Sequence, residues 1–246
     1  MIVCVAANPS IDKLFEVERL VLGDIHRPIG FVQTAGGKGF NVARAAHSLG
    51  AEVRVAAILR GHAGRWLEET LQAEGIGGAF VWAHGENRSS LSVADREAGT
   101  LTEFYEHGPD TPVAVWPEFV DAASRLFRPE SWLTISGSMP RGLPEDGYRD
   151  LVAEARAAGM RVALDAEGEA LRLALEARPE IVKVNVAEAT GLIGVPVGGR
   201  DDALTTSAKL AQIDSAPSVT TRNEMCALVM RTPLISPMPS PNASVT

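Results

Sequence analysis

The chain has 246 residues, of which 46% are hydrophobic, and this size suits one large α/β core with a small appended element. Its net charge of −8 disfavours contact with a phosphate backbone over a broad surface, so we expect no nucleic-acid partner. The two cysteines, Cys4 and Cys226, show no metal-binding spacing and form no disulfide framework, which favours a reducing compartment.

The chain starts with a short apolar run, residues 1–7, that ends at Asn8-Pro9. The run has neither the basic start nor the long apolar centre of a signal peptide, so it predicts a first β-strand. No stretch approaches the roughly 18 uninterrupted apolar residues of a membrane span. We therefore expect a cytoplasmic location and no membrane partner.

Short apolar runs alternate with helical patterns along most of the chain, which predicts an α/β fold with a mostly parallel sheet and helices on both faces. In the first predicted helix, Val42, Ala43, Ala46 and Leu49 are expected to share one face, and Gly50 is expected to end the helix. Helical segments are also expected after the last two strands. Strands are predicted at 2–6, 53–59, 132–136, 161–164 and 181–184, and helices at 40–49, 65–74 and 144–158.

Two segments, 11–33 and 88–106, depart from this pattern because apolar and polar residues alternate along them, as in antiparallel strands. Both lie next to segments proposed to bind a ligand, so we expect a small β-lid over the site. We treat residues 1–230 as a single domain. Residues 231–246, rich in proline and serine, are expected to form an irregular tail.

A block of small and polar residues opens the first predicted helix: Gly36-Gly37-Lys38-Gly39-Phe40-Asn41. It is neither a Walker A loop nor a Gly-x-Gly-x-x-Gly dinucleotide motif. Gly36 and Gly37 allow close approach of the backbone, the helix start offers unpaired N–H groups, and Lys38 adds a mobile charge. The block favours binding of an anionic small molecule, and the alternative is a plain turn before a helix.

Two charged residues near the predicted lid are further candidates. Asp12 could accept hydrogen bonds from sugar hydroxyls, although a single Asp is more often a turn or cap residue. Arg88 could clamp a phosphate through its planar guanidinium, although most arginines lie on the surface. The five histidines are scattered singly, which argues against a metal cluster.

Two later segments also follow predicted strands. The segment Ser136-Gly137-Ser138-Met139-Pro140 lacks the Gly-x-Ser-x-Gly nucleophile pattern, so we interpret it as a ligand-facing loop. In the second segment, Asn185 and Glu188 could hold the water shell of a magnesium ion beside nucleotide phosphates. They could equally form a capping box at a helix start, and the local sequence does not separate the two.

Polar residues therefore follow several of the predicted parallel strands, at Asn8, Ser136 to Ser138, Asp165 and Asn185. Ligands of open α/β sheets bind outside the carboxyl ends of the strands. The sequence thus predicts one crevice in which distant segments meet.

Together these segments resemble the phosphofructokinase B (PfkB) family of carbohydrate kinases, in the ribokinase-like superfamily, and especially its branch of 1-phosphofructokinases and tagatose-6-phosphate kinases. The resemblance runs from Met1 to about Leu210. It is carried by Asn8-Pro9-Ser10-Ile11-Asp12, by the glycine block through Arg44, by the Arg88 segment, by Thr102-Glu103 with Gly108-Pro109, by Ser136 to Pro140, by Leu164-Asp165 and by residues 183–188.

The resemblance implies phosphorylation of a hexose phosphate by ATP with Mg²⁺, under a β-lid. It implies substrate binding by Asp12, Gly36, Gly37, Lys38, Asn41, Arg88 and Ser138. It implies contacts to the nucleotide by Lys183, Asn185, Glu188 and Thr221, with Glu188 as the metal residue. The lid is also expected to offer edge strands to a second copy, which would form a homodimer.

The chain departs from the family pattern in two places. The family has a Gly-Ala-Gly-Asp type segment whose backbone forms an anion hole and whose Asp activates the sugar hydroxyl, but this sequence has no glycine after Gly199. In the segment Thr220-Thr221-Arg222-Asn223, Asn223 also replaces the glycine of a nucleotide-binding turn. We therefore assign no catalytic residue and expect a chain truncated at its C-terminus with impaired turnover. The alternatives are a non-catalytic binding or regulatory protein and a decayed fragment.

Overall fold

The computed structural model describes residues 1–193, 218–222 and 225–229, the last two ranges as backbone only. Eight strands form the main sheet, in the order β11-β12-β10-β9-β8-β1-β4-β5. The strands from β10 to β5 run parallel, whereas β12 pairs antiparallel with β10 and β11 pairs antiparallel with β12. Their bounds are β1 (Ile2–Ala6), β4 (Val53–Arg60), β5 (Gly77–Ala83), β8 (Trp132–Ser136), β9 (Arg161–Asp165), β10 (Ile181–Asn185), β11 (Ser218–Arg222) and β12 (Met225–Val229).

Helices cover both faces of this sheet. Alternate residues of β1 belong to different cores: Val3 and Val5 pack with α3, α4 and α5, whereas Cys4 and Ala6 pack with α1 and α2. Because both faces are buried, the central strands are apolar at almost every position. The helices are α1 (Lys38–Ser48), α2 (Gly61–Ala73), α3 (Val115–Ser124), α4 (Gly147–Ala157), α5 (Gly168–Ala174), the 3₁₀ turn η1 (Leu175–Ala177) and α6 (Val186–Ile193).

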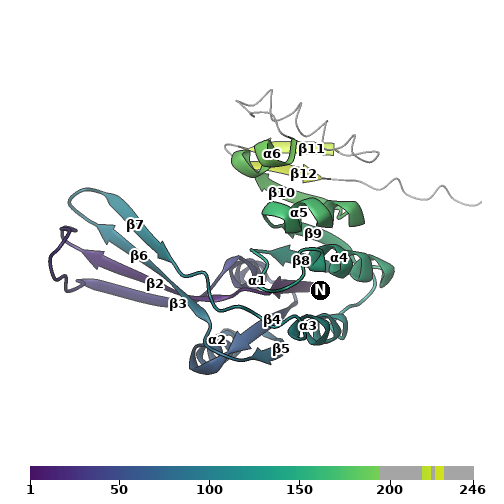
Figure 1. Cartoon of the computed structure of the whole chain (residues 1–246), viewed down its shortest axis with the longest axis horizontal. Helices are drawn as coiled ribbons and strands as arrows, with labels where there is room; N and C mark the ends of the chain where they lie inside the picture. Colours follow the sequence, from purple (N-terminus) through teal and green to yellow (C-terminus); the bar gives the residue numbers. More distant parts are fainter. Residues whose placement is uncertain (194–217, 223–224, 230–246) are drawn as a thin grey trace, which may run out of the picture.

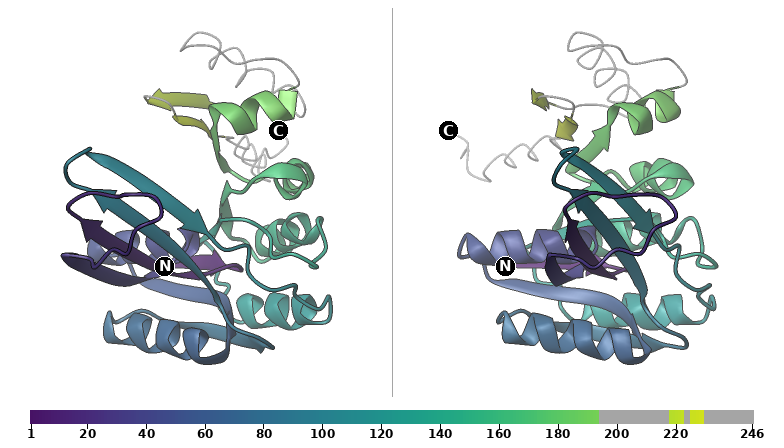
Figure 2. Two further views of the ribbon diagram at one scale, coloured as in Figure 1. Left: turned by 60° about the vertical axis from the view of Figure 1, so that its left-hand side comes forward. Right: turned by 90° about the vertical axis from the view of Figure 1, so that its left-hand side faces the viewer.

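A second, four-stranded sheet projects from the main sheet, and the chain enters it after the carboxyl ends of β1 and β5 (Figure 1). We call it the second sheet; its order is β3-β2-β6-β7. In the left view of Figure 2 it extends to the left, whereas α3, α4 and α5 lie to the right. Its strands are β2 (Ser10–Val17), β3 (Gly30–Gly36), β6 (Arg88–Asp95) and β7 (Thr100–Tyr105). The predicted fold class is thus confirmed: a mostly parallel sheet between helices, with a small additional sheet.

Several predicted details differ from the structure. Helix α1 starts two residues earlier than expected, because Gly37 has a φ of 91° and leads the chain directly into the helix. Leu49, expected inside the helix on the same face as Ala43, is instead its C-cap and is 87% exposed. Strand β5 and helix α3 were not predicted: β5 begins with two glycines and is ordered by pairing with β4. The predicted tail at 231–246 lies outside the described residues.

Helix α2 also starts earlier than predicted, at Gly61, because its cap comes from a distant residue. The Glu86 carboxylate accepts hydrogen bonds from the backbone N–H groups of His62, at 3.0 Å, and Ala63, at 2.9 Å. A carboxylate at this position also complements the positive end of the helix dipole. The N–H groups of Ala63 and His62 lower the pKa of Glu86 to about 2.

Replacing Glu86 with glutamine is expected to lower the melting temperature at pH 7 by about 2–4 °C. The folded-state pKa lies below the ordinary value of 4.5, so this stabilisation is complete above pH 4.5 and is lost as the pH falls towards 2. Thermal unfolding at pH 7, 5 and 3 measures the difference between wild type and variant. Glu69→Gln, at an exposed position of the same helix, serves as the control. A difference that stays constant down to pH 3 would contradict the prediction.

Within the described part of the chain, no helix has the length and apolar character needed to cross a membrane.

Candidate functional site

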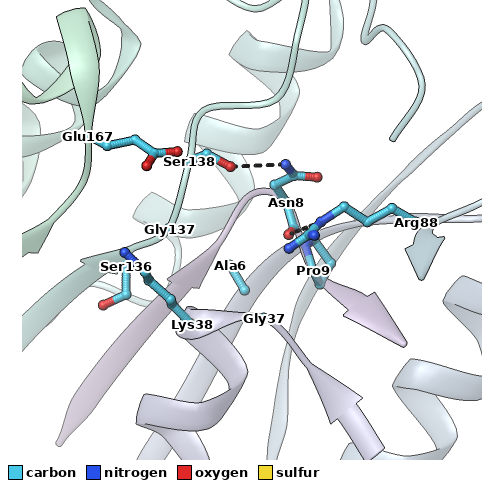
Figure 3. A pocket seen from close by; sticks show the side chains of 11 residues that line it. Ala6, Asn8, Pro9, Gly37, Lys38, Arg88, Ser136, Gly137, Ser138 and Glu167 are labelled. Atoms are coloured by element: carbon cyan, nitrogen blue, oxygen red, sulfur yellow. Dashed lines mark hydrogen bonds between the residues drawn. The ribbon is translucent and has the colours of Figure 1, made fainter. Parts of the chain in front are cut away.

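A pocket opens at the carboxyl ends of the central parallel strands, where β1 lies between β8 on one side and β4 on the other. This is a topological switch point, because the chain leaves β1 towards β4 and later returns on the opposite side at β8. The pocket has a volume of about 100 Å³ and is partly open to solvent. It is lined by Ala6, Asn8, Pro9, Gly37, Lys38, Gly39, Arg88, Ser136, Gly137, Ser138 and Glu167 (Figure 3).

The start of α1 forms one wall of the pocket. Gly37 is its N-cap, and no side chain caps the helix at this end. The N–H groups at the start of a helix carry a partial positive charge and are well suited to bind an anion. Gly39 sits directly on β1, because a Cβ atom here would lie 2.3 Å from the carbonyl oxygen of Val5. The sequence thus needs glycine to bring the helix start down to the pocket floor.

Two lysines next to the pocket share one carboxylate. Asp165, at the end of β9, accepts from Lys38 Nζ at 3.2 Å and from Lys183 Nζ at 2.9 Å. The backbone carbonyl of Asp165 accepts from the N–H of Gly137 at 2.8 Å, which joins the ends of β8 and β9. Asp165 thus holds both lysine side chains at this edge of the pocket.

Arg88 enters the pocket from the start of β6. Its Nε donates to the Asn8 carbonyl at 3.3 Å, and its Nη1 donates to Ser90 Oγ at 3.4 Å and to the Glu106 carbonyl at 3.5 Å. Burial is the largest effect on the pKa of Arg88 and lowers it, while the charges of Asp12 and Glu106 act in the opposite direction. All three hydrogen bonds are long, so the guanidinium retains capacity for a stronger, charge-assisted partner.

The loop after β8 faces Arg88 across the pocket. Asn8 Nδ2 donates to Ser138 Oγ at 3.1 Å, which connects the ends of β1 and β8 (Figure 3). Below the loop, the hydroxyl of the buried Tyr148 lies 3.4 Å and 3.3 Å from the carbonyl oxygens of Gly137 and Ser138. Ser138 therefore presents its hydroxyl from a supported loop, as a residue that orients a ligand would.

Three of the predicted substrate residues do not line the pocket. Asp12 accepts from Ser10 Oγ at 2.6 Å and from the N–H of Gly37 at 3.4 Å, so its carboxylate contacts the glycine turn, and its charge also acts on Arg88 in the pocket. Gly36 ends β3 beside this carboxylate. Asn41 lies exposed in the first turn of α1, where its Oδ1 accepts from Arg44 Nη1 at 3.2 Å.

The predicted nucleotide residues form a separate group. Asn185 and Glu188 form the capping box of α6: the N–H and Nδ2 of Asn185 donate to Glu188 at 2.7 and 2.8 Å, and the N–H of Glu188 donates back at 2.8 Å. Of this group, Lys183 connects to the pocket edge through Asp165. Thr221 lies in β11, opposite Cys226 in the strand pairing.

Glu167 is a lining residue that the sequence analysis does not assign. It lies two residues beyond the end of β9 and brings a carboxylate to the pocket beside Ser138 (Figure 3). The double role of Asp165 towards Lys38 and Lys183 is a second feature found only in the structure. In the sequence, only the position of Asp165 and Glu167 points to a role in the site, because both lie at or just after the carboxyl end of a parallel strand.

Comparisons with known proteins agree on one group of enzymes. The profile of the pfkB family carbohydrate kinases matches residues 3–225. A tagatose-6-phosphate kinase of Staphylococcus epidermidis is 32% identical over 199 residues, which is 80% of this chain and 64% of that protein. The chain thus spans less than two thirds of the length of this relative.

Solved structures give the same picture. Phosphofructokinase-2 from Escherichia coli in complex with fructose-6-phosphate has a TM-score of 0.84 at 25% identity, covering 100% of this chain and 82% of that one. A possible 1-phosphofructokinase from Thermotoga maritima has a TM-score of 0.80 at 26% identity, covering 94% and 75%.

Proposed function

Because the chain belongs to the PfkB family of carbohydrate kinases, we propose that it binds a hexose phosphate and transfers a phosphoryl group from ATP to one of its hydroxyls. The observation that carries the proposal is the meeting of Gly37, Lys38, Arg88 and Ser138 in one pocket. These residues come from three distant segments. Together they supply two cations, a helix start and a hydroxyl, which suit a ligand with both a phosphate and hydroxyl groups.

Each residue has a role in the proposed reaction. Arg88 binds the phosphate that the sugar already carries, and Asn8 and Ser138 orient its hydroxyls. The start of α1 and Lys38 neutralise the charge that builds up on the transferred phosphoryl group. Phosphoryl transfer depends mainly on such positioning and charge neutralisation.

ATP and Mg²⁺ are proposed to bind on the side of Lys183, Asn185, Glu188 and Thr221. Both carboxylate oxygens of Glu188 accept hydrogen bonds from Asn185, and each retains a lone pair that could accept from water. Mg²⁺ keeps several waters and needs few protein ligands, so Glu188 suits contact through this water shell. When bound, the ion would neutralise charge on the nucleotide phosphates, with Glu188 holding its water shell.

A second candidate function is sugar-phosphate binding without phosphoryl transfer. These 246 residues contain no glycine after Gly199. They therefore contain no glycine-rich segment with a general-base Asp in that region, and this favours the second candidate. This part of the sequence lies mostly outside the described residues. Loss of a general base lowers rates by about 10²–10⁴-fold, so we expect slow turnover by the 246-residue chain.

A coupled assay of ADP release with fructose 1-phosphate, fructose 6-phosphate and tagatose 6-phosphate tests the proposal, together with calorimetric binding of each sugar. Turnover of any of the three supports the kinase. Binding without turnover supports the second candidate. If none of the three binds, the pocket assignment is wrong and both candidates fail.

We also propose that the second sheet joins two copies of the chain. Successive side chains of a strand point to opposite faces, so the pairing register places Phe15, Phe31, Leu91, Val93 and Phe104 on the face opposite Asp12 and Ser90. Phe31 is 57% exposed and Phe104 is 58% exposed. Such an apolar face favours contact with a second copy. Sedimentation velocity at micromolar concentration tests this, and a 26.1 kDa species alone would refute it.

A further inference from the structure

Arg60 is a buried cation at the carboxyl end of β4. Its side chain and backbone together are only 4% exposed, and burial lowers the pKa of its guanidinium. Among the residues that the structure describes, no carboxylate forms an ion pair with it. A buried charge without a counter-charge is costly unless hydrogen bonds compensate for the lost water, so the acceptors around Arg60 must be held in place.

Those acceptors lie on two connections that join the second sheet to the rest of the fold. The Nη1 of Arg60 donates to the carbonyl of His84 at 2.8 Å, and its Nη2 donates to the hydroxyl of Thr111. The backbone N–H of Arg60 donates to Asn87 Oδ1 at 2.7 Å. His84 and Asn87 lie in the connection from β5 to β6, whereas Thr111 lies in the connection from β7 to α3 (Figure 1).

Both connections are anchored to the core at these same residues. Asn87 Nδ2 donates to the carbonyl of Ile58 in β4 at 3.3 Å. The N–H of Thr111 donates to the carbonyl of Arg141 at 2.7 Å. Arg60 therefore links the point where the chain enters the β6-β7 hairpin to the point where it leaves. Asn87 immediately precedes Arg88, so this link lies one residue from the cation in the pocket.

We propose that Arg60 is a positioning residue. It holds together the two connections at the base of the β6-β7 hairpin and thereby keeps Arg88 at the pocket. If either connection moved away, a buried guanidinium N–H group would lose its acceptor, and this loss disfavours a conformation in which the hairpin is displaced. The consequence for phosphate binding rests on the function proposed above. The effect on the hairpin does not, because the contacts exist in the chain without a ligand.

Hydrogen–deuterium exchange of the unliganded 246-residue chain tests the effect on the hairpin. In Arg60→Met, which keeps a long side chain but removes the charge and donors, amides of β6 and β7 are expected to exchange at least about 10-fold faster. Amides of β1 and β8 should be unchanged. The matched control is Arg54→Met, an exposed position on the same strand, which should leave β6 and β7 as in wild type.

Thr111→Val provides a milder variant in case Arg60→Met does not fold. It removes one acceptor at constant size, and exchange is expected to increase in β7 more than in β6. Calorimetry with fructose 6-phosphate gives the second readout: Arg60→Met should weaken binding about 10-fold, and Arg60→Lys, which retains the charge, should recover part of it.

Equal exchange of β6 and β7 in Arg60→Met and Arg54→Met would overturn the inference, as would unchanged β7 exchange in Thr111→Val. Faster exchange supports it, even if the wild-type chain binds no hexose phosphate, in which case only the proposed function fails. If the wild-type chain binds a hexose phosphate but exchange in Arg60→Met is unchanged, the proposed function stands and the inference about Arg60 fails.

Discussion

Replacing Arg88 with methionine is expected to weaken the binding of fructose 6-phosphate or tagatose 6-phosphate by about 100-fold. Arg88 reaches the pocket through long hydrogen bonds to two carbonyls and a hydroxyl, and among the described residues none of its hydrogen bonds goes to a carboxylate that a phosphate would have to displace. Methionine fills similar space but provides neither charge nor donors. Isothermal titration calorimetry of wild type and variant measures the loss.

Two controls make this result specific. Arg96→Met removes an arginine just beyond the end of the same strand, where it pairs with Glu16 at 3.2 Å on an exposed surface, and it should leave binding unchanged. Fructose without a phosphate should bind wild type and Arg88→Met equally weakly. If Arg88→Met binds hexose phosphates as wild type does, the phosphate lies elsewhere and the role given to Arg88 is wrong.

Replacing Gly39 with alanine is expected to destabilise the fold by about 3 kcal/mol, which corresponds to a fall in melting temperature of about 6–12 °C. The added Cβ would lie 2.3 Å from the carbonyl oxygen of Val5 and 2.8 Å from the Cα of Ala6. Both are backbone atoms of the β1 edge, so they cannot move aside as a flexible side chain could. Helix α1 must instead shift away from the sheet, which also moves Lys38 from the pocket.

Thermal unfolding measures the loss of stability, and calorimetry with fructose 6-phosphate measures the loss of binding. Gly191→Ala is the matched control, because Gly191 also lies in a helix but has open space where the Cβ would go. In that variant alanine is expected to raise the melting temperature slightly. A Gly39→Ala protein as stable as wild type would show that the contact between α1 and β1 is looser than the geometry indicates.

The hydrophobic pattern of the sequence alone was sufficient to predict the central strands of the main sheet. Ile2–Ala6 and Trp132–Ser136 were predicted at their observed bounds, because a strand buried on both faces is an uninterrupted apolar run between polar turns. Elements whose order comes from distant partners were missed or shortened. The start of α2 depends on Glu86, and β5 depends on its pairing with β4, neither of which is local in sequence.

Some features of the candidate site could likewise be predicted from the sequence, and others could not. Gly37, Lys38, Arg88 and Ser138 were predicted from residue type, position and the family resemblance, and they line one pocket because parallel strands bring their carboxyl ends to one edge. Asp12 and Asn41 were predicted for the same pocket; the structure places Asp12 in contact with the glycine turn and Asn41 exposed in the first turn of α1, and their contact with a substrate stays a prediction. The direction of a side chain depends on its contacts, and these are set by tertiary packing.

By itself, the sequence determined the α/β fold and the second sheet, because apolar periodicity is a local property. It also led to a prediction of the chemical character of the ligand, from the polar residues at the strand ends. Only the tertiary structure decided how the charges are shared: Asp165 between two lysines, Glu167 beside Ser138, and Arg60 between two connections. Each of these depends on segments far apart in the chain whose separation in space is set by packing of the cores. Such distances leave no trace in local sequence.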